Sequence, residues 1–68
     1  MFFEFGDNVV NANAISELVR THQDGKYKII AFRLDGSYMS SESFSTEGER
    51  ETRMSDILNR FMTNNILM

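Results

Sequence analysis

The sequence contains no cysteine, no proline and no tryptophan, and only one histidine. Without cysteine there is no disulfide, which small secreted domains normally use to hold their folds together. A single histidine with no cysteine also excludes the usual Cys/His zinc sites. We therefore expect no metal and no other cofactor.

Targeting signals and long apolar runs are missing as well. No apolar segment approaches the roughly 20 residues that a membrane-spanning helix needs. The first residues, MFFEFGD, have neither the basic region nor the apolar region of a signal peptide. We expect a cytoplasmic protein with no membrane contact.

Positive charge is scarce. Seven Lys and Arg face ten Asp and Glu, which gives a formal net charge of −3. Nucleic acids attract proteins through basic surface, so this balance argues against a nucleic-acid partner. Most of the six Phe and two Tyr are also needed for the core of so small a protein, not for base stacking.

The chain has 68 residues, which is enough for one domain spanning residues 1–68. A chain of this size buries only about 60% of the surface that its unfolded form exposes. The stability expected from such a core is roughly 3–5 kcal/mol. With disulfides and metals excluded, self-association is the remaining way to supplement the core.

Turn sequences separate β-prone stretches in the first two thirds of the chain. Asp24-Gly25 and Asp35-Gly36 are typical of tight hairpin turns, and Gly6-Asp7-Asn8 is a third turn signal. We expect strands between and beside these turns. The predicted strands span about residues 2–5, 9–11, 14–22, 26–34 and 37–44.

The segment 13–22 has two interpretations. Ile15, Leu18 and Val19 have helical spacing, and Asn13 is a suitable N-cap. The tight turn that follows, with an obvious strand after it, favours instead a strand that pairs across the turn. We favour the strand, and the helix remains open.

The strand predicted at 26–34 is apolar on both faces near its middle, because Ile29–Phe32 are consecutive apolar residues. This pattern is typical of a central strand with another element, or another subunit, on each side. The next strand is more polar. Alternation there predicts that Tyr38, Ser40, Glu42 and Phe44 share one face.

A helix is predicted at about residues 47–63. Thr46 and Glu49 form a capping-box pattern at its start, and Glu49 and Arg53 have the spacing of an i, i+4 ion pair. Apolar residues then recur at helical spacing and must pack against the sheet. This stripe consists of Met54, Ile57, Leu58, Phe61 and Met62.

These elements define an α+β fold: a small antiparallel β-meander of three to five strands, with one C-terminal amphipathic helix packed on one face. From Val9 to about Glu42 the order of features resembles the FlbD-like small flagellar proteins. The matching residues are VVNANAISELV, a tight turn and KIIAFRLDGSYMSSES. The resemblance implies the strand interpretation and the meander, and it carries no functional residue across.

No residue pattern indicates catalysis. Asp7, Asp24 and Asp35 fall at turns, and the other acids include Glu42 on the edge strand and those on the outer face of the predicted helix. No nucleophile-elbow sequence surrounds any serine. A chain this short also leaves little room for a pocket that excludes water. We expect the protein not to be an enzyme.

One charge asymmetry indicates a candidate site. Basic residues gather in the hairpin predicted at 15–34, whereas acids concentrate between Glu42 and Asp56. A basic hairpin on an acidic protein can bind an anionic ligand or an acidic partner, although such side chains more commonly cover exposed sheet surface. The candidate ligand-binding or partner-binding residues are Arg20, His22, Lys26, Lys28 and Arg33.

Two apolar features predict self-association into a homodimer or small oligomer. One is the second apolar face of the strand at 26–34, and the other is the apolar ending of the sequence. The candidate contact residues are Ile30, Phe32, Ile66, Leu67 and Met68.

Three classes of function follow. The first is a small accessory or inhibitor protein that binds another protein, of the kind that phages and mobile elements encode. Its acidic segment would cover a basic site on that partner. The second is an oligomeric binder, or sequestering protein, for a small phosphorylated or anionic ligand. The third is a structural or assembly component.

Overall fold

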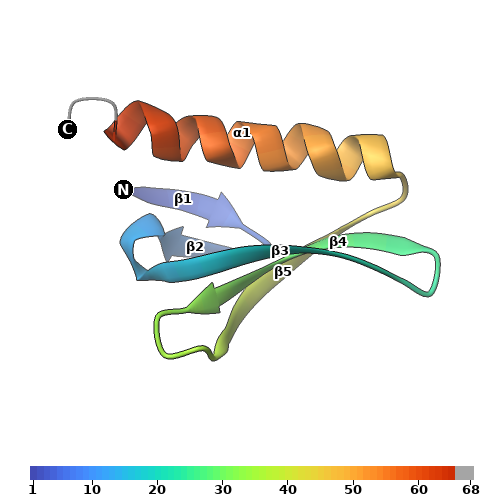
Figure 1. The fold of residues 1–68 in the computed structure, drawn as a ribbon, viewed down its shortest axis with the longest axis horizontal. Helices are drawn as coiled ribbons and strands as arrows, with labels where there is room; N and C mark the ends of the chain where they lie inside the picture. The colour runs from blue at the N-terminus through green and yellow to red at the C-terminus, as the bar shows by residue number, and fades with distance from the viewer. Residues whose placement is uncertain (66–68) are drawn as a thin grey trace.

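The computed structural model describes the backbone of residues 1–65 and the side chains of residues 1–61. The chain forms the predicted α+β fold, with five strands followed by one helix (Figure 1). Of the predicted self-association residues, Ile66, Leu67 and Met68 lie outside the described residues. The elements are β1 (Phe2–Phe5), β2 (Asn8–Asn11), the 3₁₀ turn η1 (Ala12–Ala14), β3 (Ile15–Gln23), β4 (Lys26–Arg33), β5 (Tyr38–Phe44) and α1 (Glu47–Asn65).

The strands form two antiparallel units. β1 and β2 make a hairpin, and β3, β4 and β5 make a three-stranded meander with β4 in the centre. The segment with two interpretations is a strand from Ile15 onward, paired with β4 as far as Gln23 opposite Lys26. The helix interpretation, with Asn13 as N-cap, is therefore wrong. The short turn η1 precedes the strand, and its N-cap is Asn11, whose side chain accepts a hydrogen bond from the Asn13 N–H.

The hairpin turns explain this register. Asp24 and Gly25 both have positive φ, 52° and 75°. This is the conformation of the two-residue type I′ turn, whose twist matches that of the flanking strands. Gly6 has a φ of 64° and begins the β1–β2 turn. Both turns therefore favour antiparallel hairpins from local sequence alone.

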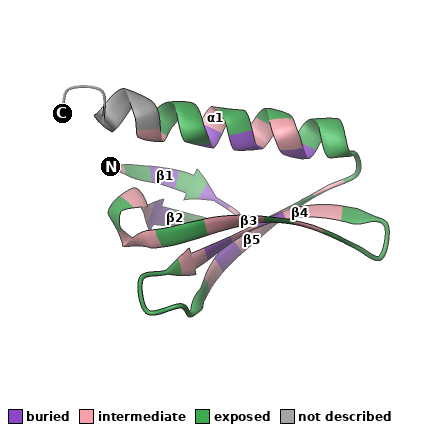
Figure 2. Ribbon diagram, viewed as in Figure 1, coloured by how far each residue is buried: buried purple, intermediate pink, exposed green. Residues whose placement is uncertain are grey.

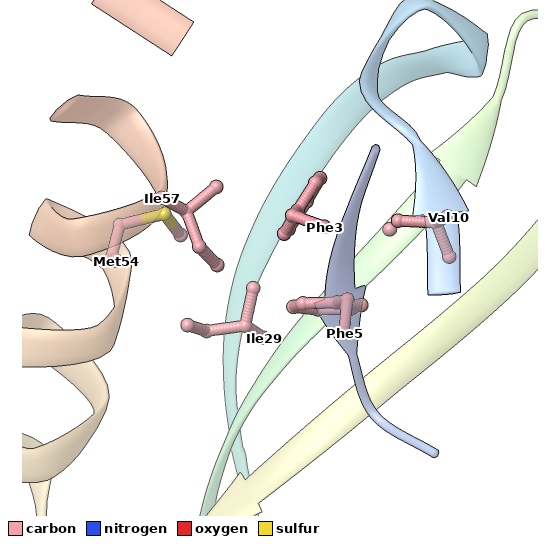
Figure 3. Close-up of a cluster of buried hydrophobic side chains, with 7 residues drawn as sticks. Phe3, Phe5, Val10, Ile29, Met54 and Ile57 are labelled. Carbon is pink, nitrogen blue, oxygen red and sulfur yellow. The ribbon is translucent and has the colours of Figure 1, made fainter. Parts of the chain in front are cut away.

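The hydrophobic core lies on one face of the meander. Ile29 and Ala31 of β4 point toward α1 and the β1–β2 hairpin, and both are fully buried. Figure 3 shows the aromatic side chains of β1 between β4 and β2, with the helix residues opposite. The core residues are Phe3, Phe5, Val10, Ile29, Ala31, Met54 and Ile57.

β3 and β5, the strands on either side of β4, both have an irregular pairing register near Phe32. The register shifts between Ile15 and Glu17 in β3, and again where Phe32 pairs with Tyr38 and Ala31 with Ser40. Met39 is thus an extra residue in β5, and such a bulge reverses the alternation beyond it. The prediction that Tyr38 shares a face with Ser40 is therefore wrong: Tyr38 lies opposite Phe32, and Met39 packs against the core.

The helix begins as predicted, with one correction. The Glu49 carboxylate accepts the N–H groups of Ser45 and Thr46, and the Thr46 hydroxyl accepts the N–H of Glu49. This capping box engages the Glu49 side chain at the helix start. The expected Glu49–Arg53 pair does not form, because Arg53 instead binds Glu42 of β5 and Asp56.

Gly6→Ala is expected to destabilise the fold by at least about 2 kcal/mol. A Cβ at this position would lie 2.4 Å from the Ser40 Oγ and 2.7 Å from the Ser41 carbonyl oxygen, on a backbone with positive φ. Urea unfolding measures the loss.

Gly25→Ala is the matched control. Gly25 also has positive φ, but a Cβ there meets nothing within 4 Å. Its cost should be about 1 kcal/mol, the conformational strain alone. Equal costs for the two variants would show that the close packing of Gly6 against β5 is not needed.

Candidate functional site

A groove of about 400 Å³ lies between β3 and α1. Its volume is within the range of pockets that hold ligands. Residues from η1, Ser16, Glu17 and Arg20 contribute polar atoms to its walls. The apolar side chains that line this α1–β3 groove are Met1, Ile15, Leu18, Met54, Leu58 and Phe61.

The groove exists because the helix does not cover the whole sheet. α1 packs mainly over β4 and β5. Part of its apolar stripe therefore faces the space beside β3 and is not fully covered. Leu58 is consequently 41% exposed, although Met54 and Ile57 beside it are buried. Phe61 is held at the wall by an edge-on contact with Phe3, with ring centroids 5.8 Å apart.

The strand that borders the groove is an edge strand. Within the described residues β3 pairs only with β4, and its other side has no neighbouring strand. It is nine residues long. A long edge strand presents backbone N–H and C=O groups to which another extended chain can pair.

A cluster of charged side chains closes one end of the groove. Arg20 of β3 donates to Glu51 of α1 at 2.9 Å, and the Arg50 Nε donates to the same carboxylate at 2.8 Å. The Arg50 Nη1 also donates to the Thr21 carbonyl at 3.0 Å. Hydrogen bonds from Arg50 and then Arg20 hold the pKa of Glu51 below its ordinary value. The charges of this cluster are thus satisfied within the protein.

The structure does not gather the five predicted basic-hairpin residues into one site. Arg20 faces α1, and His22 stacks on Tyr27 with ring centroids 4.1 Å apart. Lys26 and Lys28 belong to the face of the sheet opposite α1. Arg33 lies at the other end of β4, where it donates to the Ser37 hydroxyl and the Tyr38 carbonyl.

The acidic segment is also different from a free anionic surface. Glu42 and Asp56 both pair with Arg53, and Asp56 is additionally 3.4 Å from Arg60. The sequence shows these arginines among the acids, but helical spacing alone does not reveal that Arg53 reaches back to β5. The α1–β3 groove was not predicted either, because the position of α1 relative to β3 is a tertiary property.

Metal-binding clusters and membrane-spanning helices are both missing from the described part of the chain. No group of three or more His, Cys, Asp or Glu side chains is close enough to hold a metal ion there. No helix among those residues combines the length and apolar character needed to cross a membrane.

The chain matches no protein-family profile, no curated protein and no solved structure. The resemblance to FlbD-like proteins therefore stays a prediction.

Glu51→Gln should reduce the acid sensitivity of the protein. The lowered pKa of Glu51 means that its contribution to stability is present above its ordinary value of 4.5 and is lost as pH falls through the folded-state value. The variant should start with a lower melting temperature near neutral pH and lose less of it on acidification. Thermal unfolding between about pH 7 and about pH 3 measures this. Parallel pH profiles for the two proteins would contradict the assignment.

Proposed function

We propose that this protein is a non-enzymatic binding protein, and that the α1–β3 groove receives an extended segment of another protein. One observation carries the proposal: an apolar groove runs beside a nine-residue edge strand that pairs with no other strand in the described residues. An accessory or inhibitor protein of a phage or mobile element, acting in the cytoplasm, would work in this way.

The edge of β3 favours a strand as the occupant. Backbone polar groups at a sheet edge are satisfied by water or by another extended chain, and a strand added there gains main-chain hydrogen bonds along its length. The helix wall opposite, with Leu58 and Phe61, supplies apolar contacts for alternate side chains of such a strand.

The charges around the groove favour an apolar segment. Arg20, the basic residue in the groove wall, is already paired with Glu51. A charged ligand side chain would have to compete with an existing ion pair, whereas an apolar side chain would cover Leu58 and Leu18. Burial of apolar area gives roughly 25 cal/mol per Å².

The small anionic ligand is the weaker alternative. It requires several basic groups aimed at one point, but Arg20, Lys28 and Arg33 point to three different parts of the molecule. Nothing in the geometry favours that function over protein binding.

Leu58→Asp should weaken the binding of peptides selected against the protein. The probe is a displayed library of random nine-residue peptides, the length of β3. Selected peptides should have apolar residues at alternate positions and should perturb the amide signals of Ser16–Leu18. Because Leu58 is 41% exposed, the substitution should leave the fold intact. Titration calorimetry with one selected peptide measures the loss, expected to be about tenfold or more.

Leu34→Asp is the matched control, since Leu34 is 72% exposed and does not line the groove. It should bind the same peptide as the unchanged protein does. The proposal fails if the library yields no binder, or if Leu34→Asp weakens binding as much as Leu58→Asp.

A further inference from the structure

The face of the meander opposite α1 is covered by no other element of the described chain. Cross-strand register places Val19 of β3 and Ile30 of β4 side by side on this open face, followed by Phe32. All three residues are intermediate in burial, the class that Figure 2 colours pink. They form a continuous apolar strip, while the packed core occupies the other side of β4.

The two ends of this strip carry opposite charges. Lys28 is two positions from Ile30 along β4, and Glu17 lies opposite Phe32 at the other end. Neither side chain has an ion pair within the described residues. Four positions of strand, or roughly 13 Å, separate their levels. Lys28 and Glu17 of one chain are therefore too far apart to pair with each other.

This arrangement is complementary to itself. Suppose that two open faces meet about a twofold axis running across the strands through Val19 and Ile30. Strand direction is then reversed between the copies, so Lys28 lies over the end of the other copy that carries the partner's Glu17. The twofold symmetry produces this contact between Lys28 and the partner's Glu17 twice. Val19 and Ile30 meet their own counterparts, and Phe32 lies against the stem of the partner's Lys28.

The alternative twofold axis, running along the strands, is disfavoured by the same charges. It would place Lys28 over the partner's Lys28 and Glu17 near the partner's Glu17, and like charges across an interface are costly. Facing sheets lie about 10 Å apart, a distance that a lysine and a glutamate side chain can bridge together.

We infer that the open face is a homodimer interface, in which Val19, Ile30 and Phe32 form the centre and Lys28 pairs with the partner's Glu17. A second copy is the occupant because the charge pattern of the face is its own complement. The α1–β3 groove lies on the side of the sheet that carries α1. Glu17 is the one residue that both surfaces share, at the rim of the groove, and the apolar lining of the groove from α1 stays outside the dimer contact. This inference does not depend on the proposed function.

Charge reversal tests the inference by sedimentation equilibrium over a wide range of concentrations. The unchanged protein should dimerise at tens of micromolar. Lys28→Glu and Glu17→Lys should each weaken dimerisation by at least about tenfold, because each creates two like-charge contacts. The double variant, Lys28→Glu with Glu17→Lys, should regain dimerisation, since the pair is restored with its signs exchanged.

Glu47→Lys is the control for charge alone. It makes the same charge change as Glu17→Lys, on α1 at an exposed position. Its dimerisation should match that of the unchanged protein, and circular dichroism should confirm that every variant is folded. A monomer at all concentrations overturns the inference, and so does a dimer that neither reversal weakens or that the double variant fails to regain.

Discussion

The architecture depends on one partly buried ion pair, between Glu42 of β5 and Arg53 of α1. The Arg53 Nε and Nη2 donate to the two carboxylate oxygens of Glu42 at 2.8 and 3.1 Å, and the N–H of Gly6 donates to the same carboxylate at 3.0 Å. Arg53 also donates to the Glu4 carbonyl and to Asp56. The hydrogen bond with Glu42 raises the pKa of Arg53. One arginine thus joins the helix, the meander and the β1–β2 hairpin.

The Glu42–Arg53 ion pair determines which surfaces of the sheet stay uncovered in the described chain. It holds α1 over β5 and β4 and fixes the β1–β2 hairpin beside β5, where the Ser40 hydroxyl also donates to the Phe5 carbonyl. One helix and one hairpin pack on the same face of the three-stranded sheet (Figure 1). Among the residues that the structure describes, no element covers the opposite face and no strand pairs with the free edge of β3. The groove and the open face are therefore consequences of the same packing, and both proposals use surface that this small fold does not cover.

Local sequence predicts the elements of this fold well, and long-range contacts explain the differences. Asp24-Gly25 specifies its hairpin, and the Thr46/Glu49 capping box specifies the helix start, because each acts over a few residues. The bulge at Met39 follows from packing against the core, so simple alternation misplaced Tyr38. Proximity in sequence suggested Glu49 as the partner of Arg53, whereas folding brings Glu42 to it. The groove depends on the position of α1 across the sheet, which no local pattern encodes.

A double-mutant cycle on the Glu42–Arg53 ion pair tests this account most directly. The free energy of unfolding is measured by urea denaturation for the unchanged protein, Glu42→Gln, Arg53→Met and the double variant. The account predicts a coupling free energy of about 1–3 kcal/mol, since either substitution alone removes the contacts that both side chains share. Additive losses, with a coupling near zero, would show that the helix and the hairpin are held by the apolar core alone and would contradict the account.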